Sequence, residues 1–160
     1  MMDVSILGLN ELEARFNAFP DVLNAALLSK SQDLVNALQQ KVQDNLSGAV
    51  LAEKTGLLKS SIDTDVEDTG NGASASVFVG GDVPYAAIQE YGGQTKAHII
   101  EATQGKALAF NWAGKQAFFT RINHPGSYIP ERSYLRSAFG EMQGEIVDGF
   151  GNALADSITR

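Results

Sequence analysis

The chain contains no cysteine among its 160 residues, and it has only two histidines. The absence of cysteine excludes disulfide scaffolds and zinc ribbons, and it fits a reducing compartment such as the cytoplasm. No apolar run approaches the roughly 20 residues that cross a bilayer. The first residues, Met1–Ile6, lack the basic start and apolar stretch of a signal peptide. We therefore expect neither a membrane protein nor a secreted one.

Positive charge is scarce as well. The 12 Lys and Arg residues are outnumbered by 19 Asp and Glu residues, which gives a formal net charge of −7. Proteins that hold nucleic acid by its backbone carry clustered Lys and Arg, because phosphate neutralisation supplies most of the affinity. No such cluster occurs here, and this argues against DNA binding as the main task.

The sequence also lacks recognisable catalytic patterns. His98 and His124 are the only histidines, and they do not form a His-x-x-x-His pair. There is no Gly-x-Ser-x-Gly elbow and no glycine-rich phosphate-binding loop. We therefore predict that the chain is not an enzyme and binds no metal or cofactor. His124, which precedes Pro125 and Gly126, is interpreted as a residue that shapes its loop.

The length suits a single domain over residues 1–160, able to bury about two-thirds of the surface of the unfolded chain. We predict helix over 9–46, sheet and loops over 57–131, and a C-terminal helix over 133–158. The fold class is therefore α+β. Long N- and C-terminal helices would pack on a small antiparallel sheet built from two hairpins.

The N-terminal third has apolar residues at three- and four-residue steps, which indicates helix. Because proline breaks a helix interior, Pro20 predicts a short helix over 9–17 and a long one over 20–46. The apolar stripe is interpreted as a core-facing surface. It consists of Leu9, Leu12, Phe16, Leu23, Leu27, Leu34, Leu38 and Val42.

The first predicted hairpin has strands at 61–67 and 73–79, joined by the turn cluster 68–72. Alternation places Asp63, Asp65 and Glu67 on one side of the first strand. We interpret these acids as a solvated face, since a hard-cation site would also need a turn to bring the oxygens together.

The second predicted hairpin joins strand 108–112 to strand 116–122 through a short glycine turn. Phe118, Thr120 and Ile122 are expected to oppose Leu108, Phe110 and Trp112. An alternative function, a nucleic-acid-binding accessory module, would use the 106–122 hairpin, where Lys106, Lys115 and Arg121 flank the aromatic residues. Around this hairpin we expect a polar loop at 94–106 and an extended segment at 123–131.

Residues 84–93 predict one or two helical turns that end at Gly92, where a left-handed cap is possible. Glu90, the single acid of this stretch, is interpreted as a residue that orients the glycine loop. The C-terminal helix contains several glycines, which are unfavourable inside a helix. We expect it to be stable only when docked.

Three short segments, taken in order, resemble one family. They are Thr-Gly-x-Leu before the first strand, Tyr-Ala-x-x-x-Glu-x-Gly-Gly at 85–93, and the start of the last helix. Together they span roughly residues 50 to 140 and are similar to the neck and tail-completion proteins of tailed bacteriophages. Tyr91 and the doubled glycine depart from the Phe-Gly-Thr of many relatives. The residues that carry the resemblance are Thr55, Gly56, Leu58, Tyr85, Ala86, Glu90, Gly92, Gly93, Leu135 and Ala138.

The resemblance implies a virion structural protein, assembled in the bacterial cytoplasm, that acts in tail completion or head–tail joining. It implies a homo-oligomeric ring, hexameric in the family, that contacts the tail-tube and head-connector proteins while DNA passes through without specific binding. A tail terminator that caps the tube, or a minor tail component, is an alternative position. We expect the second hairpin and the segments 94–106 and 123–131 at subunit contacts. The candidate interface residues are Asp63, Asp65, Glu67, His124, Pro125, Arg132 and Arg136.

Overall fold

The computed structural model describes residues 8–52, 54–70, 72–103, 105, 107–112 and 114–159. Some sequence-based predictions fall elsewhere. The stretch Met1–Ile6, Asn71 of the predicted turn and Lys106 of the predicted basic flank lie outside the described residues, as does the side chain of Trp112. Within the described part, no helix combines the length and the hydropathy that crossing a membrane requires.

The α+β fold class is confirmed: long terminal helices accompany small antiparallel ladders. The chain divides into two compact units, residues 1–86 with 133–160, and residues 87–132. The prediction of one domain over the whole chain stays a prediction. The two units are described in turn.

In the first unit, α1 (Leu9–Asp44) is one continuous helix that runs through Pro20. The predicted break at this proline was wrong. Proline removes one intrahelical hydrogen bond, but Phe16 and Pro20 both occupy exposed positions, so water can satisfy the carbonyl that loses its partner. A π-helical segment, η1 (Asn45–Ala49), follows α1, and a single helical turn, α2 (Leu57–Ser60), comes next.

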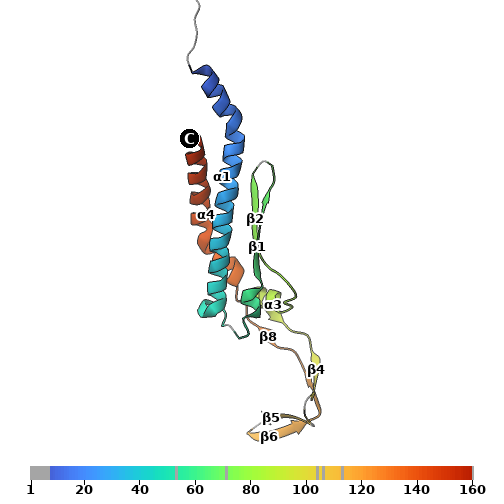
Figure 1. Cartoon of the computed structure of the whole chain (residues 1–160). Coiled ribbons are helices and arrows are strands. Elements are labelled where there is room, and N and C mark those ends of the chain that lie inside the picture. Colours follow the sequence, from blue (N-terminus) through green and yellow to red (C-terminus); the bar gives the residue numbers. More distant parts are fainter. Residues whose placement is uncertain are drawn as a thin grey trace, which may run out of the picture. The chain divides into compact units, whose positions relative to one another are not determined.

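The last helix, α4 (Tyr134–Thr159), runs antiparallel to α1 along its side (Figure 1). Lys41 and Glu141 form an ion pair across them at 2.6 Å. Further along the pair, a Cβ added to Gly149 would stand 3.4 Å from Leu34 Cδ1, so the helices approach closely there. The predicted helix over 133–158 is thus confirmed to within one residue at each end.

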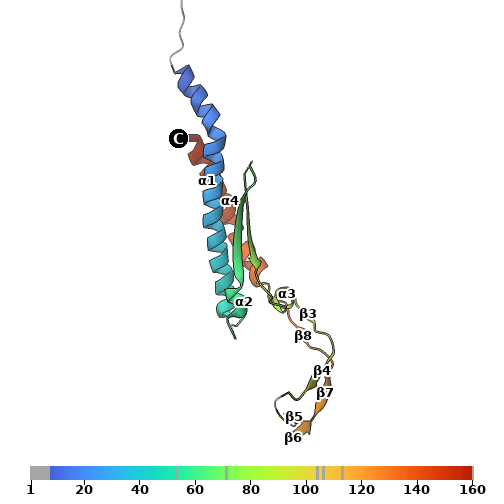
Figure 2. The same ribbon diagram turned by 45° about the vertical axis from the view of Figure 1, so that its right-hand side comes forward.

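The first hairpin consists of β1 (Ile62–Asp68) and β2 (Ala73–Val79), paired antiparallel from Ile62 with Val79 to Asp68 with Ala73. It packs against α1 (Figure 2). Gln39 donates from Nε2 to the carbonyl of Ile62 at 2.7 Å. The second strand lies where the sequence predicted it, whereas the first is shifted by one residue.

The core of this unit forms where α1, α2, β1 and α4 meet. Val42 and Ala138 are completely buried, and Tyr134 is almost so. The buried cluster comprises Leu38, Val42, Leu46, Leu58, Ile62, Val83, Ala86, Tyr134, Ala138 and Met142. The interpretation of the N-terminal apolar stripe as a core surface therefore holds for its last two residues, Leu38 and Val42, whereas Leu9, Leu12 and Phe16 are exposed.

The second unit begins in α3 (Ala86–Tyr91) and contains three two-stranded antiparallel ladders. The first joins β3 (Gly93–Gln94) to β8 (Tyr128–Ile129) and the second joins β4 (His98–Glu101) to β7 (Arg121–His124). The predicted loop 94–106 and the segment 123–131 thus contain short strands.

The third ladder is the hairpin of β5 (Leu108–Trp112) and β6 (Lys115–Phe119). Its register differs from the prediction. Leu108 lies opposite Phe119 and Phe110 opposite Ala117, so Phe118 is on the other face. The turn pairs Trp112 with Lys115, and a one-residue change of register moves every side chain to the opposite face.

Candidate functional site

The first segment of the resemblance forms the start of α2. Gly56 precedes this turn, and its carbonyl accepts a hydrogen bond from the Ser60 amide at 2.9 Å. Leu58 belongs to the core cluster. The segment therefore places one apolar side chain in the core and returns the chain towards β1.

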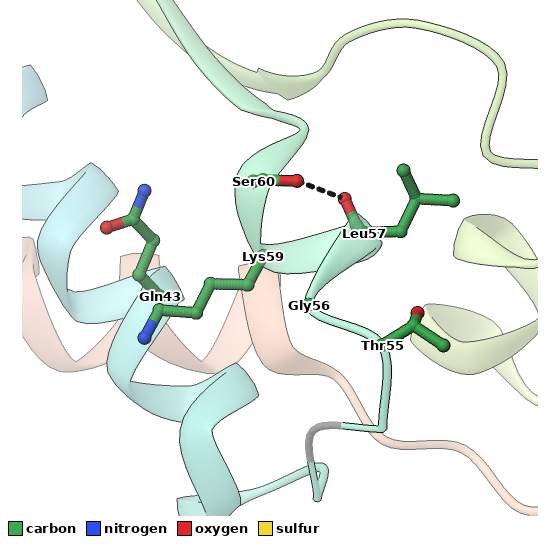
Figure 3. A pocket seen from close by; sticks show the side chains of 6 residues that line it. All are labelled: Gln43, Thr55, Gly56, Leu57, Lys59 and Ser60. Atoms are coloured by element: carbon green, nitrogen blue, oxygen red, sulfur yellow. Dashed lines mark hydrogen bonds between the residues drawn. The ribbon is translucent and has the colours of Figure 1, made fainter.

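Beside this turn lies an open hollow of about 560 Å³ (Figure 3). Its lining includes Thr55 and Gly56 together with Gln43 of α1, and the Lys59 side chain extends towards Gln43. Ser60 Oγ donates to the carbonyl of Leu57 at 3.0 Å. The hydroxyl of Ser60 is thus occupied by its own helical turn.

The second and third segments meet the first in the core. Ala86 and Ala138 belong to the same buried cluster as Leu58. The hydroxyl of Tyr134, at the start of α4, donates to the carbonyl of Ala86 at 3.4 Å. Leu135 packs against this cluster, whereas Tyr85 is partly exposed. Residues from all three segments therefore form one packed centre.

The glycine loop after α3 is tightly constrained. Gly92 has a φ of 68°, and a Cβ there would stand 2.6 Å from the Glu131 amide nitrogen. The predicted left-handed cap at Gly92 is confirmed, and only glycine fits it without a backbone shift. Gly93 then begins β3, and Glu90 is buried in the turn before. The suggestion that Glu90 orients this loop stays a prediction.

Asp63, Asp65 and Glu67 occupy the exposed positions of β1, so they share the outer face of the hairpin. Across the ladder they face Phe78, Ser76 and Ser74, and this largely polar face is open to solvent. Among the described residues, no three His, Asp or Glu side chains are grouped as a metal ion would need.

At the end of the same strand, Asp68 connects the hairpin to α1. It accepts from the Gly70 amide at 2.7 Å and from the Asn24 side-chain amide at 3.0 Å. The Gly70 amide, and after it the Asn24 amide, hold the pKa of the Asp68 carboxyl below its ordinary value. The charged form of Asp68 therefore stabilises the tip of the β1–β2 hairpin against α1.

His124 pairs with His98 across β7 and β4, with ring centroids 5.0 Å apart. Its Nδ1 accepts a hydrogen bond from the Gly126 amide at 3.1 Å. The imidazole thus caps the turn that contains Pro125, as expected of a residue that shapes its loop.

The two candidate arginines differ in setting. Arg136 lies in α4, whereas Arg132 precedes that helix and donates its amide to the Gln89 carbonyl at 2.9 Å. Their spacing of four residues would place them one turn apart on a helix, but Arg132 lies outside α4.

The β5–β6 hairpin and the first residue of β7 display aromatic and basic side chains. Phe118 and Phe119 are exposed, and so are Lys115 and Arg121. Phe110 and Phe119 stack with ring centroids 5.5 Å apart. Part of the aromatic surface thus packs within the hairpin itself.

Sequence reasoning missed Asn45, a buried polar residue at the end of α1. Its side-chain amide donates to the Tyr134 carbonyl at 2.9 Å and to Ser137 Oγ at 3.2 Å. A polar residue that continues an apolar stripe shortly before Gly48 is a weak signal for such a role. Its partners lie 89 and 92 residues away, a separation that local patterns do not reveal.

No protein-family model, curated protein or solved structure matched the chain.

Proposed function

We propose that this chain is a structural protein of a tailed-bacteriophage virion. It acts in tail completion or head–tail joining, as one subunit of a homo-oligomeric ring at the neck or the tail-proximal end. Assembly takes place in the bacterial cytoplasm, and the ring joins tail-tube and head-connector proteins. A terminator that caps the tail tube is the alternative position for the same subunit.

The observation that carries the proposal is the meeting of the three resemblance segments in one core. Leu58, Ala86 and Ala138 come from segments far apart in sequence, yet all belong to the same buried cluster. Gly92, from the second segment, has the backbone conformation that its position in the motif suggests. The three short segments thus have related structural roles. This supports a similarity of fold more than a chance match of short sequence motifs.

The surface supports assembly as the mode of action. Large apolar side chains stand exposed along both long helices, Phe16 on α1 and Val147 on α4 among them. Where exposed apolar side chains gather in a contiguous patch, the patch marks a protein–protein contact. A subunit that joins two larger structures needs such contacts on more than one side.

An acidic lumen is the part of the mechanism that concerns DNA. The outer face of β1, with Asp63, Asp65 and Glu67, would repel the phosphate backbone if it lined the ring, so that DNA slides without sticking. Reversal of these three charges to lysine should then slow DNA ejection. Ejection at the wild-type rate would show that this strand does not line the channel.

Electron microscopy of particles made by a phage that lacks this chain tests the proposed function directly. Filled heads beside separate tails of normal length are the expected result. Separate tails of uncontrolled length would instead indicate the terminator position. Normal, infectious virions would refute a structural role in the particle.

A further inference from the structure

The N-terminal turns of α1, residues 9–23, extend past the end of α4. Lys41 pairs with Glu141, and Leu34 lies against Gly149. In this antiparallel register the last turn of α4 reaches only the turn of α1 that contains Leu23. Figure 1 shows the blue end of α1 continuing beyond the C-terminus. We call residues 9–23 the helical arm.

Large apolar side chains form a line along this arm. They recur at alternating steps of three and four residues, the spacing of a helix that packs on another helix. Phe16 is 70% exposed and Leu9 54%, so the line is uncovered near the arm's tip. This arm stripe consists of Leu9, Leu12, Phe16, Phe19 and Leu23.

A second line with the same alternation runs along α4, on the side opposite its buried residues Ala138, Met142 and Ala153. Val147 is 70% exposed and Ile158 60%. A Cβ added to any of the three glycines in this line would meet nothing within 4 Å. This outer stripe consists of Gly140, Gly144, Val147, Gly151, Leu154 and Ile158.

We propose that the arm stripe of one copy of this chain packs on the outer stripe of a neighbouring copy. The large side chains of the arm would enter the notches that Gly140, Gly144 and Gly151 leave along the outer stripe, on either side of Val147. An arm cannot cover the outer stripe of its own chain, because its own α1 occupies the opposite face of α4. The occupant must therefore come from another molecule.

Exposed apolar side chains are present on both sides of the proposed contact. Leu9, Leu12 and Phe16 of the arm are half exposed or more, and Val147, Leu154 and Ile158 are 44% to 70% exposed. All six are apolar, so their burial would contribute to the apolar part of the contact. A specific interface needs about 1,000 Å² in total, slightly more than half of it apolar.

The arm carries one cation among the acids Glu11, Glu13 and Asp21, and α4 is acidic as well, so a single charge pair would fix the alignment of the two helices. Arg15 is the only cation of the helical arm, and it borders the arm stripe by helical position. The outer stripe contains no charged residue, but the acids Glu141 and Asp148 border it on one side. An Arg15 to Asp148 pair would set the alignment of the helices more than the strength of the contact.

The contact joins two different surfaces. Each copy therefore binds one neighbour through its arm and a second neighbour through its outer stripe. Such heterologous contacts close into a ring or continue as a chain. The inference thus deepens the proposed function by naming the contact between neighbouring subunits, and it rests on that function for the closure of the ring.

Complementation between two variants of the purified full chain tests the contact. Phe16→Asp disables the arm, and Val147→Asp disables the outer stripe. By sedimentation equilibrium, the wild type should associate, and each variant alone should require at least about tenfold higher concentration. An equimolar mixture should form a one-to-one dimer, because the mixture retains one intact arm and one intact outer stripe.

Leu57→Asp, at a half-exposed position outside both stripes, is the matched control and should associate as the wild type does.

Circular dichroism verifies that each variant is helical before its association is compared. Three results would overturn the proposal: a wild type that stays monomeric up to about 1 mM, a Val147→Asp variant that associates like the wild type, or a mixture that forms no dimer. The second would indicate arm-to-arm contact, and loss of association in the control would indicate a different surface.

The outcome is separable from that of the proposed function. If the contact forms in solution but phage lacking the chain makes normal virions, the contact stands and the virion role fails. If heads and tails separate without the chain, yet phage carrying Phe16→Asp assembles normally, the virion role stands and the contact fails.

Discussion

Asn45, in the first turn after α1, donates its side-chain amide to the backbone carbonyl of Tyr134, the first residue of α4, at 2.9 Å. Both residues are buried. Tyr134 in turn donates its hydroxyl to the Ala86 carbonyl. Asn45 therefore links the end of α1 to the beginning of α4, at the point where the three motif segments meet.

Replacement of Asn45 by leucine should destabilise the first unit by about 1–3 kcal/mol, because the buried Tyr134 carbonyl would lose its donor. The shift of the urea-unfolding midpoint measures this effect. Asn36→Ala, at an exposed position of the same helix, is the matched control and should stay within about 0.5 kcal/mol of the wild type. If the two substitutions lowered the unfolding free energy equally, the proposal that Asn45 links the two helices would be contradicted.

Replacement of Gly92 by alanine should open the ladder between β3 and β8. Its Cβ would stand 2.6 Å from the Glu131 nitrogen and 3.0 Å from the Ile129 carbonyl oxygen, both of them backbone atoms. Gly81 has a similar φ of 70° but no atom within 4 Å of an added Cβ, so Gly81→Ala isolates the dihedral strain. Amide hydrogen exchange should accelerate at Gly93 and Ile129 in Gly92→Ala only. Acceleration in both variants alike would assign the effect to something other than the clash.

The contribution of Asp68 to stability should depend on pH. Its folded pKa lies below the ordinary value because of Gly70 first and Asn24 second, so the charged form is favoured in the folded chain. This stabilisation is present above the unfolded pKa of about 3.9 and is lost as the pH falls through the lower folded value. Asp68→Asn should therefore be less stable than the wild type at pH 7, and the difference should shrink towards pH 3 in urea titrations.

Asn24→Ala provides the companion measurement, because it removes the second donor and leaves Gly70 in place. This variant should show a weaker pH dependence of stability than the wild type. A difference between wild type and Asp68→Asn that is the same at both pH values would contradict the assignment.

The spacing between α1 and α4 should limit the size of residue 149. Gly149→Leu should destabilise the helix pair by about 1–3 kcal/mol, since overpacking forces neighbouring side chains out of place. Gly149→Ala is the matched variant, because its Cβ would reach only ordinary contact with Leu34 and Lys30 while gaining helix propensity. Thermal unfolding should place the leucine variant below the wild type and the alanine variant at or above it. A leucine variant as stable as the alanine variant would contradict the close approach.

Retention on a DNA column should be weak and nearly independent of salt. Lys115 of β6 and Arg121 of β7 flank the exposed Phe118 and Phe119, but the chain as a whole carries a formal charge of −7. Because a protein that neutralises several phosphates loses affinity steeply as salt rises, a steep salt dependence would favour the nucleic-acid-binding alternative. Lys115→Gln should then abolish part of that dependence.

Local patterns predicted the terminal helices and the strands of the two hairpins, but not the short ladders β3–β8 and β4–β7. Alternation in 73–79 located β2, and the helical stripe after Ser133 located α4 within one residue at each end. The predicted helix break at Pro20 was wrong, because an exposed helix tolerates the missing hydrogen bond. The register predicted from the glycine turn of the second hairpin was wrong by one residue. Phe118 and Phe119 therefore lie on the faces opposite to those predicted.

The sequence by itself determined the position of α4 and of the β1–β2 hairpin, because side-chain periodicity and turn residues act over a few neighbours. It also determined the acidic face of β1, since alternation alone puts Asp63, Asp65 and Glu67 on one side. Only the tertiary structure decided which faces remain uncovered. The antiparallel register of α1 and α4 leaves the arm stripe beyond the last turn of α4 and turns the outer stripe away from the core. That register depends on contacts such as Asn45 with Tyr134, between residues 89 positions apart, which no local pattern encodes.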